Sequence, residues 1–404
     1  MNIAKTDLQR FSGRWETKRL GDIAHIKTGS KNNEDKDENG QYPLFVRSAI
    51  AEQINSYCYD GEAILVPGEG GIGSIFHYIN GRFDCHQRVY MINKFSDDVC
   101  GKLVYYSMVL QFGSHAMQNT VKATVDSLRL PTFKNFSFSL PQDIGEQRAI
   151  AKVLSDVDGL LNALEGLIAK KQAIKQATMQ QLLTGRTRLP GFSGKWERKR
   201  LGEIGTLTKG RGIKRDDVSS EGLPCVRYGE LYTRYQDYIL KVRSRIPPNI
   251  AATALPIKKG DLLFAGSGET AEEIGRCAAY LGEEPAYAGG DVIVLIPSGH
   301  NSIYLGHLMN SSIVSAQKAR MGQGDAVVHI YINNLAQVQI ELPSITEQNA
   351  IASVLSDMDS EIAALEQRRD KTRAIKQGMM QQLLTGRVRL SESRICTDDT
   401  DYAD

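Results

Sequence analysis

The sequence predicts an α+β protein made of two α/β domains with mixed sheets, each followed by one long helix. Three observations support this prediction. A stretch of 44 residues occurs twice, at 146–189 and at 347–390, with about two in three positions identical. The apolar residues of both copies are spaced by threes and fours, which is the period of a helix. The segments before each copy contain short apolar runs bounded by glycine and proline, which are typical of strands.

The repeated stretch has the pattern of a long helix with one apolar seam. A helix of about 40 residues at about 1.5 Å per residue is roughly 60 Å long, too long for one compact domain, so we predict a spacer. Two such helices could bury their seams against each other, whereas two unrelated surface helices are the alternative. The predicted seam residues are Ile150, Leu154, Val157, Leu161 and Leu164 in the first copy, and Ile351, Leu355, Met358, Ile362 and Leu365 in the second.

Local signals mark both ends of each predicted helix. An Asp or Ser stands three residues before the first Glu of each copy, which is the spacing of a capping box. These pairs are Asp143 with Glu146 and Ser344 with Glu347. Near the other end, Gly185 and Gly386 occupy the position expected of a left-handed C-terminal cap.

The repeat extends beyond the helix. The motif FSGRWETKRLGDI at 11–23 returns as FSGKWERKRLGEI at 192–204, and the two tryptophans of the chain, Trp15 and Trp196, hold the same position in it. This usage favours a packing anchor over a ligand contact. Gly, Pro and Ser gather at 185–195, the predicted linker. The predicted parts are a first domain at 1–142, a first helix at 143–186, a second domain at 187–343, a second helix at 344–387 and a polar tail at 388–404.

The two globular segments differ in sequence but share a layout. Each has a short strand that ends in arginine, two further apolar strands with a glycine-rich turn between them, and then a helical pattern. This order predicts a mixed, twisted sheet in each domain. The predicted strands lie at 43–47, 61–66 and 88–92 and at 224–227, 260–265 and 291–296, and the predicted helical stretches lie at 98–118 and 301–321.

Bulk composition is that of an ordinary globular protein. The chain has 404 residues, 41% hydrophobic and 24% charged, and a net charge of +2, which neither requires nor excludes nucleic acid. The six cysteines are scattered without a CxxC motif, which indicates free thiols in a reducing compartment. We find no signal-peptide pattern and no apolar run of about 18 residues, so a cytoplasmic protein outside the membrane is expected.

Motifs that resemble catalytic sites do not have the context that catalysis requires. Gly68–Gly73 matches GxGxxG, but residues 74–79 favour a strand where a dinucleotide site needs a helix, so a tight turn is predicted. The Pro-Pro pair at 247–248 has Ile and Asn as neighbours, which do not suit an adenine methyltransferase loop. There is no phosphate loop and no HExxH, and the seven histidines show no metal-ligand spacing. We therefore predict no catalytic residue and no metal.

Basic and polar residues on the predicted loops are candidates for DNA contacts. Such side chains suit phosphate contacts and the reading of guanine or adenine edges, although solvated surface charge is the alternative for at least half of them. The prediction concerns the group and not any individual residue. The candidates are Arg47, Arg82, His86, Gln87, Arg88 and Lys122 in the first domain, with Asn119 beside them, and Arg211, Arg215, Arg227, Tyr228, Arg243 and Arg245 in the second, with Arg234 beside them.

The duplicated motifs resemble those of the DNA specificity subunits of Type I restriction-modification systems, over nearly the whole chain. The most specific are the helix openings LP…EQ…AIA..LS..D at 140–156 and 342–357, supported by QQLLTGR at 180–186 and 381–387. The resemblance implies two target recognition domains separated by an antiparallel coiled coil of the two long helices, with pseudo-twofold symmetry. It implies that each domain reads one half of a bipartite, asymmetric site in double-stranded DNA while the helices set the gap.

The resemblance also implies partners. The two modification (methyltransferase) subunits would dock on the conserved regions and carry S-adenosylmethionine and the catalytic sites, and restriction (endonuclease/translocase) subunits would join them. The chain itself would be non-catalytic and hold no cofactor. The resemblance does not indicate which bases are read, how long the gap is, or whether a restriction subunit is present. A self-sufficient DNA-modifying enzyme with an unrecognised active site is the alternative, and a coiled-coil scaffold without nucleic acid is a third possibility.

Overall fold

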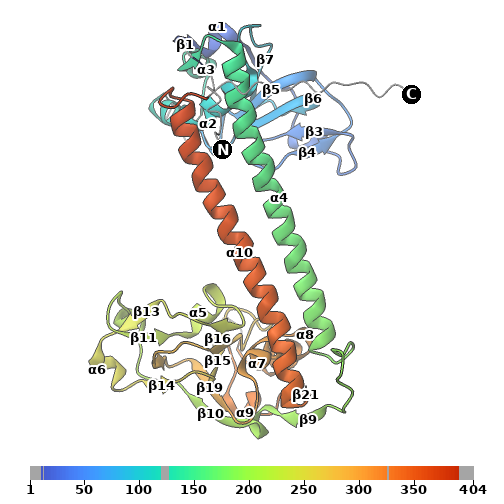
Figure 1. Ribbon diagram of the computed structural model, residues 1–404, viewed down its shortest axis with the longest axis vertical. Coiled ribbons are helices and arrows are strands. Elements are labelled where there is room, and N and C mark those ends of the chain that lie inside the picture. The colour runs from blue at the N-terminus through green and yellow to red at the C-terminus, as the bar shows by residue number, and fades with distance from the viewer. Residues whose placement is uncertain (1–10, 12, 120–126, 325–326, 391–404) are drawn as a thin grey trace, which may run out of the picture. The chain divides into compact units, whose positions relative to one another are not determined.

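The computed structural model describes residues 11, 13–119, 127–324 and 327–390 (Figure 1). The chain forms two compact units. Unit 1 comprises Met1–Glu165 together with Gln367–Asp404, and unit 2 comprises Gly166–Glu366. The two long helices, α4 (Ile144–Leu182) and α10 (Ile345–Leu383), have 39 residues each. Each unit therefore contains one globular domain, called here the first or the second domain, and about half of each long helix.

The first domain is built on a six-stranded mixed sheet. Its order is β2-β7-β5-β6-β3-β4, and β3 pairs with β6 in parallel whereas the other neighbours are antiparallel. Valine, isoleucine and aromatic residues are frequent in these strands, as pleated, half-buried backbone favours. The strands are β2 (His25–Thr28), β3 (Tyr42–Phe45), β4 (Glu52–Ile54), β5 (Tyr59–Pro67), β6 (His77–Cys85) and β7 (Val89–Asn93).

Helices cover one face of this sheet. The helix α2 (Gly101–Gln118) buries Leu103 and Phe112 in the core that also contains Ile64 of β5 and Ile92 of β7. A short two-stranded sheet joins the duplicated opening motif to the segment before α4. The remaining elements are β1 (Trp15–Arg19), α1 (Leu20–Ile23), η1 (Asn33–Asp35), α3 (Leu130–Lys134) and β8 (Ser137–Pro141), of which β1 and β8 pair.

The second domain divides its strands among several sheets. A five-stranded sheet has the order β10-β19-β15-β17-β12, a four-stranded sheet has the order β13-β11-β18-β14, and β16-β20 and β21-β9 form two-stranded sheets. The strands are β9 (Glu197–Arg200), β10 (Gly205–Lys209), β11 (Leu223–Val226), β12 (Tyr238–Ile239), β13 (Ser244–Ile246), β14 (Leu255–Ile257), β15 (Leu262–Ala265), β16 (Ser267–Gly268), β17 (Cys277–Tyr280), β18 (Ala286–Ala288), β19 (Val292–Pro297), β20 (Val328–His329) and β21 (Gln339–Leu342).

The predicted helical stretch at 301–321 forms two helices. The helix α7 (Ser302–Met309) ends at Asn310, and α8 (Ser312–Met321) begins after Ser311, whose backbone is extended. The Asn310 side chain accepts from the Cys277 N–H and donates to the Cys277 carbonyl, so it pairs with strand β17. The shorter helices of unit 2 are η2 (Leu201–Glu203), η3 (Arg215–Asp217), α5 (Tyr228–Thr233), α6 (Pro248–Ala251) and α9 (Ile332–Leu335).

Inside each unit the segments of α4 and α10 pack side by side and run antiparallel. In unit 1, Asp158 pairs with Lys376 and Glu165 with Arg373, so the contacts move forward along α4 and backward along α10. In unit 2, Lys171 pairs with Glu361 and Lys175 with Asp359, in the same sense. The predicted seam residues are buried or half-buried: Ile150, Leu154, Leu161, Leu164, Ile351, Leu355 and Ile362 are buried, and Val157, Met358 and Leu365 are half-buried.

The start of each long helix is held by an arginine from beyond the end of the other. In unit 1 both carboxylate oxygens of Glu146 accept from Arg389 at 2.5 Å, and the Glu146 side chain is completely buried. In unit 2, Arg188 binds Glu347 in the same two-point manner, and the Glu347 side chain is 2% exposed. Figure 1 shows α4 beginning beside the end of α10 against the first domain.

The predicted capping boxes form only in part. The Asp143 side chain accepts from the Gly145 N–H at 2.7 Å, and Ser344 accepts from the Glu347 N–H at 3.4 Å. The carboxylates of Glu146 and Glu347, which a box would direct to the cap backbone, bind the two arginines instead. A charge-assisted two-point pair is stronger than a bond to a backbone N–H, which explains the difference.

Glycine and tryptophan meet at the end of each long helix. Gly185 and Gly386 have φ values of +67° and +70°, as the sequence predicts. A Cβ at Gly386 would lie 3.0 Å from the Trp15 ring, and one at Gly185 would lie 3.4 Å from Trp196. The duplicated tryptophans therefore cover the helix ends. Within the described ranges, no helix combines the length and the apolar character needed to cross a membrane.

Candidate nucleic-acid interface

The parallel pairing of β3 with β6 gathers candidate residues of the first domain at one sheet edge. Parallel strands end at the same edge, so Arg47, which follows β3, and His86, Gln87 and Arg88, which follow β6, come together although they are about forty residues apart. The His86 N–H donates to the Phe45 carbonyl at 2.9 Å, which fixes this arrangement.

One carboxylate lies between the two arginines of this edge. Arg88 contacts Glu69 at 3.1 Å and Arg47 contacts its other oxygen at 3.8 Å. The Arg47 and Arg88 side chains are about half exposed, whereas the Glu69 side chain is 23% exposed. A cavity of about 420 Å³ opens beside them, and it is lined by Asn33, Lys36, Val46, Arg47, Ser48, Glu52, Glu69 and Gly70.

His86 has a structural function at this edge. Its ring is buried, and its Nδ1 atom accepts from the Arg88 N–H at 2.9 Å, which closes the turn between β6 and β7. Burial is the main cause that lowers the pKa of His86, and the positive charges of Arg47 and Arg88 lower it further. A neutral His86 therefore orients Arg88, and Gln87 remains exposed beside it.

The other first-domain candidates are not part of this cluster. Arg82 binds Asp60 at 2.9 Å and lies over the Tyr57 ring, 5.0 Å from its centre. Asn119 is exposed just after α2 and donates to the His115 carbonyl at 2.8 Å. Lys122 lies outside the described residues.

Four of the second-domain candidates lie on two segments that follow strands. Arg211 and Arg215 are exposed on the segment after β10, and Arg227 and Tyr228 follow β11. The Arg211 N–H donates to the Ala288 carbonyl at 3.2 Å, which places the first of these loops against the end of β18. The parallel pairing of β11 with β18 thus gathers these side chains as β3 and β6 do in the first domain.

The remaining arginines of the second domain differ in how firmly they are held. Arg234 pairs with the buried Glu230 at 2.9 Å, and Arg245 donates to the Gly222 carbonyl at 2.9 Å, so both side chains already have protein partners. Arg243 is exposed, and its backbone N–H donates to the Tyr235 hydroxyl at 3.1 Å.

A common framework of backbone hydrogen bonds relates the two domains. Three bonds of the first domain have counterparts in the second, although the side chains differ. The Gly29 N–H donates to the Val89 carbonyl, as Gly210 does to Val292. The Gly68 N–H donates to the Arg88 carbonyl, as Gly266 does to Asp291. The His86 N–H donates to the Phe45 carbonyl, as Gly289 does to Val226. By this register Arg47 corresponds to Tyr228, Glu69 to Ser267 and Arg88 to Asp291. The same loops therefore present different chemical groups in the two domains.

The glycine-rich motif at 68–73 forms a loop, as predicted. Gly70, Gly71 and Gly73 have positive φ values, which is the backbone freedom such a turn requires. The next regular element is strand β6 and not a helix, so the N-terminal helix end that binds a dinucleotide phosphate is missing from this loop. Across the residues that the structure describes, there is no group of three or more His, Cys, Asp or Glu side chains that could hold a metal ion.

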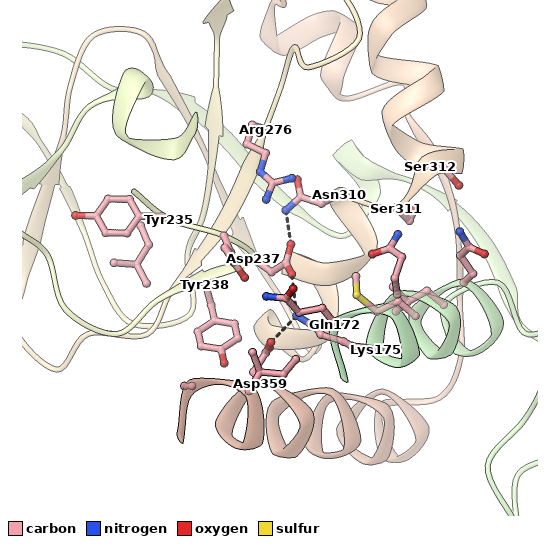
Figure 2. A pocket seen from close by; sticks show the side chains of 18 of the residues that line it. Gln172, Lys175, Tyr235, Asp237, Tyr238, Arg276, Asn310, Ser311, Ser312 and Asp359 are labelled. Carbon is pink, nitrogen blue, oxygen red and sulfur yellow. Dashed lines mark hydrogen bonds and ion pairs between the residues drawn. The ribbon is translucent and has the colours of Figure 1, made fainter. Parts of the chain in front are cut away.

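In unit 2 a polar network joins both long helices to the second domain (Figure 2). Lys175 of α4 binds Asp359 of α10 at 2.5 Å and lies 3.7 Å from Asp237 of the domain. Asp237 in turn accepts from the buried His307 of α7 and from Asn310, both at 2.8 Å. The network borders a cavity of about 680 Å³ between these elements.

Unit 1 repeats the lysine–aspartate pair at the centre of this network. Lys376 of α10 binds Asp158 of α4 at 2.5 Å, and the Tyr106 hydroxyl of α2 donates to the same carboxylate at 2.7 Å. Tyr106 thus binds Asp158 directly, whereas His307 of unit 2 binds Asp237 and lies 3.8 Å from Asp359. Lysine at a seam position restricts which alignment of the two helices is stable, because only one register pairs its charge.

Replacing Asp237 with asparagine should make the stability of unit 2 less dependent on acid pH. Burial is the largest influence and would raise the pKa of Asp237, but His307, Asn310 and Lys175 outweigh it and lower the pKa to about 2. The carboxylate thus stabilises unit 2 above its unfolded pKa of about 4, by about 2 kcal/mol, and this is lost as the pH falls toward 2. Denaturant titrations of the wild type and Asp237→Asn should differ by this amount at pH 7 and converge near pH 2. An equal difference at both pH values would contradict the assignment.

A comparison of the sequence with known protein families finds the same repeat. A family model described as "Type I restriction modification DNA specificity domain" matches residues 13–176 and again residues 193–373. The chain belongs to this family. Each match joins one globular domain to a large part of the long helix that follows it, as the duplicated sequence motifs do.

Three known proteins match this specificity-domain chain over nearly their whole length. The chain is 22% identical over 408 residues to the Type I restriction enzyme MjaVIII specificity subunit of Methanocaldococcus jannaschii, with 93% of each covered. The S subunit of a Type I restriction-modification system from M. genitalium has a similar fold, with a TM-score of 0.65, 17% identity and coverage of 95% of this chain and 98% of that one. A chain from a structure on assembly and conformational transition of the type I system has a TM-score of 0.54 at 15% identity, covering 94% and 100%.

Sequence reasoning overlooked several residues that organise this specificity-domain chain. Lys175 and Lys376 occur at the same place in both copies of the repeat, so the duplicated IKQ was the available signal. Glu69 gave no such signal, because it belongs to a glycine-rich loop whose pattern is that of a dinucleotide phosphate site. Its importance follows from the sheet topology, which brings Arg47 and Arg88 to it.

Proposed function

We propose that this chain is the non-catalytic DNA sequence-specificity subunit of a Type I restriction-modification complex. Membership of the specificity-domain family, twice in one chain, is the observation that supports this most directly. The relative from Methanocaldococcus jannaschii, matched over 93% of its length, is named as a Type I restriction enzyme specificity subunit.

In this proposal each domain reads one half of a bipartite, asymmetric site in double-stranded DNA. The common backbone framework with different side chains supports it, since two readers of one design can then select different bases. The candidate contacts at the strand ends are Arg47, Gln87 and Arg88 in the first domain, where the buried His86 supports Arg88, and Arg211, Arg215, Arg227, Tyr228 and Arg243 in the second. Arg82, Lys122 and Arg245 stay in the predicted group of DNA contacts.

The long helices act as the spacer that sets the unread gap. Two readers in the major groove on one face of DNA are about one helical turn, roughly 34–36 Å, apart. Antiparallel packing inside each unit, and the repeated lysine–aspartate pairs, support a helix pair with one defined register. A fixed register is what a spacer of constant length needs.

In this proposal the partner subunits catalyse the reactions. Two methyltransferase subunits dock on the duplicated motifs and hold S-adenosylmethionine, and restriction subunits bind the resulting assembly. A single chain with two near-identical halves offers each methyltransferase the same surface, which supports two copies of that partner. A cytoplasmic location belongs to this proposal, because the DNA and the partner subunits are there.

Mapping of methylated adenines tests the function. The chain is reconstituted with its methyltransferase partner and S-adenosylmethionine, and DNA with randomised sequence is treated and sequenced. The expected product is methylation at one split site, and only when both proteins are present. Methylation by the chain alone would overturn the proposal in favour of a self-sufficient enzyme, and binding of the complex without sequence preference would favour a scaffold.

Lengthening both helices should widen the gap. Four residues inserted near Leu164 and four near Leu365 add about 6 Å to each helix, which is close to two base pairs at about 3.4 Å each. The mapping experiment should then show the same two half-sites with a longer gap. The matched control is an insertion of four residues at Gly191, an exposed linker glycine, which should leave the gap unchanged. An unchanged gap in the helix variant would contradict the spacer role.

A further inference from the structure

The carboxylate of Glu69 is fixed between two exposed arginines. Its neighbour Gly68 donates to the Arg88 carbonyl at 2.8 Å and accepts from the Leu128 N–H at 2.8 Å, so the loop is held from two sides. Arg88 reaches one oxygen of Glu69 at 3.1 Å and Arg47 reaches the other at 3.8 Å. The three charged groups therefore form one cluster at the edge where β3 and β6 end.

This arrangement is poorly suited to a DNA phosphate. A phosphate that approached either arginine would also approach the Glu69 carboxylate, and like charges at such distances repel. Glu69 also cancels one of the two positive charges that would attract the DNA backbone. Base edges in the major groove are different, because they offer neutral donors and acceptors side by side.

We propose that Glu69 is a specificity-determining residue which, together with Arg88, reads one G·C base pair in the half-site of the first domain. The inference rests on the proposed function, since it assumes that this edge faces DNA. Arg88 donates to guanine O6 and N7, and Glu69 accepts from the N4 amino group of the paired cytosine. Arg47 holds the second oxygen of Glu69 and keeps the carboxylate in position.

The spacing and polarity of the pair match that base pair. Guanine O6 and cytosine N4 are hydrogen-bonded to each other, so they lie about 2.9 Å apart. The contacting atoms of Arg88 and Glu69 are 3.1 Å apart and present a donor opposite O6 and an acceptor opposite N4. The reversed C·G pair would set donor against donor. A T·A pair keeps the central pattern but has a methyl group in place of guanine N7, so it loses the second arginine contact.

The second domain has different groups at the corresponding positions. Ser267 takes the place of Glu69 and is bound to His329 Nδ1 at 2.9 Å, and Asp291 takes the place of Arg88. The proposed G·C contact is therefore confined to one half-site. The other half-site is an internal control in the same molecule.

The test compares base preferences of three variants in the complete complex with the methyltransferase partner. DNA libraries randomised over both half-sites are methylated and sequenced for the wild type, Glu69→Gln and Arg88→Lys. Glu69→Gln keeps the size of the side chain but can donate as well as accept, and Arg88→Lys loses the two-point contact. Both should reduce discrimination at the same base pair by about tenfold. The matched control is Glu341→Gln, which removes the charge from the exposed Arg198–Glu341 pair and should leave every preference unchanged.

The possible outcomes separate this inference from the proposed function. A wild-type complex without a split site would refute the proposed function. A split site whose preferences are the same in Glu69→Gln would refute the role of Glu69 alone. An equal loss of methylation at all sequences would show that Glu69 affects affinity and not base choice. Effects of Glu69→Gln and Arg88→Lys at different base pairs would refute the proposal that both residues read one base pair. An unchanged second half-site in each variant shows that the complex is still folded and active.

Discussion

Replacing Arg389 with methionine is expected to lower the free energy of unfolding of unit 1 by about 3–5 kcal/mol, because it leaves a buried carboxylate without its cation. Glu146 is completely buried, and both of its oxygens are bound by Arg389. Methionine retains most of the volume of the side chain, so the loss reflects charge more than packing. Denaturant unfolding, combined with hydrogen exchange of peptides from the start of α4, measures the effect.

The control for this variant is Arg198→Met, which breaks an arginine–glutamate pair whose side chains are 70% and 52% exposed. Exposed pairs contribute about 0–1 kcal/mol, so this change should be small. Arg188→Met, which removes the equivalent partner of Glu347, should destabilise unit 2 about as much as Arg389→Met destabilises unit 1. A similar small effect for all three variants would show that the buried pairs do not stabilise the helix ends.

Replacing Leu154 with alanine is expected to destabilise unit 1 by about 2–5 kcal/mol. Leu154 is completely buried, in a cluster that includes Met380 and Leu383 from the end of α10. The deletion leaves a cavity in this cluster, and the structure around such a cavity relaxes only in part. Denaturant titration of the full chain, with a probe in unit 1, measures the loss.

Leu160 provides the matched control because it lies on the same helix but is 40% exposed. Leu160→Ala should cost well below 1 kcal/mol, since little area is removed from contact. If the two leucine variants were equally stable, the seam would not be the surface that holds α4 in place.

The long helices could be predicted from the sequence because duplication made their pattern visible. Spacings of three and four, repeated in both copies, indicate the seam from residue type alone, and the seam residues are buried or half-buried. The residues that bind Glu146 and Glu347 were harder to predict from the sequence. Their spacing from Asp143 and Ser344 fitted a capping box, but the arginines that bind them are more than 150 residues away in the chain.

The sheets were partly predictable and the candidate interface much less so. Runs such as those now seen in β5 and β19 are apolar enough to be assigned from residue type alone. Which strands are neighbours is a matter of topology, and only the parallel pairing of β3 with β6 brings Arg47 to Arg88. The prediction therefore included both arginines within a group and omitted Glu69, whose significance depends on that pairing.

The division of the long helices between the units has a consequence for how the protein is made. Residues 166–366 are contiguous, so unit 2 can fold as soon as they have left the ribosome. Unit 1 cannot fold at that stage. Its core contains Ile150 and Leu154 together with Met380, Leu383 and Leu384, which are synthesised more than two hundred residues later. The domain translated first is thus completed last, and a nascent chain that stops before α10 is finished would expose the apolar surface beneath it.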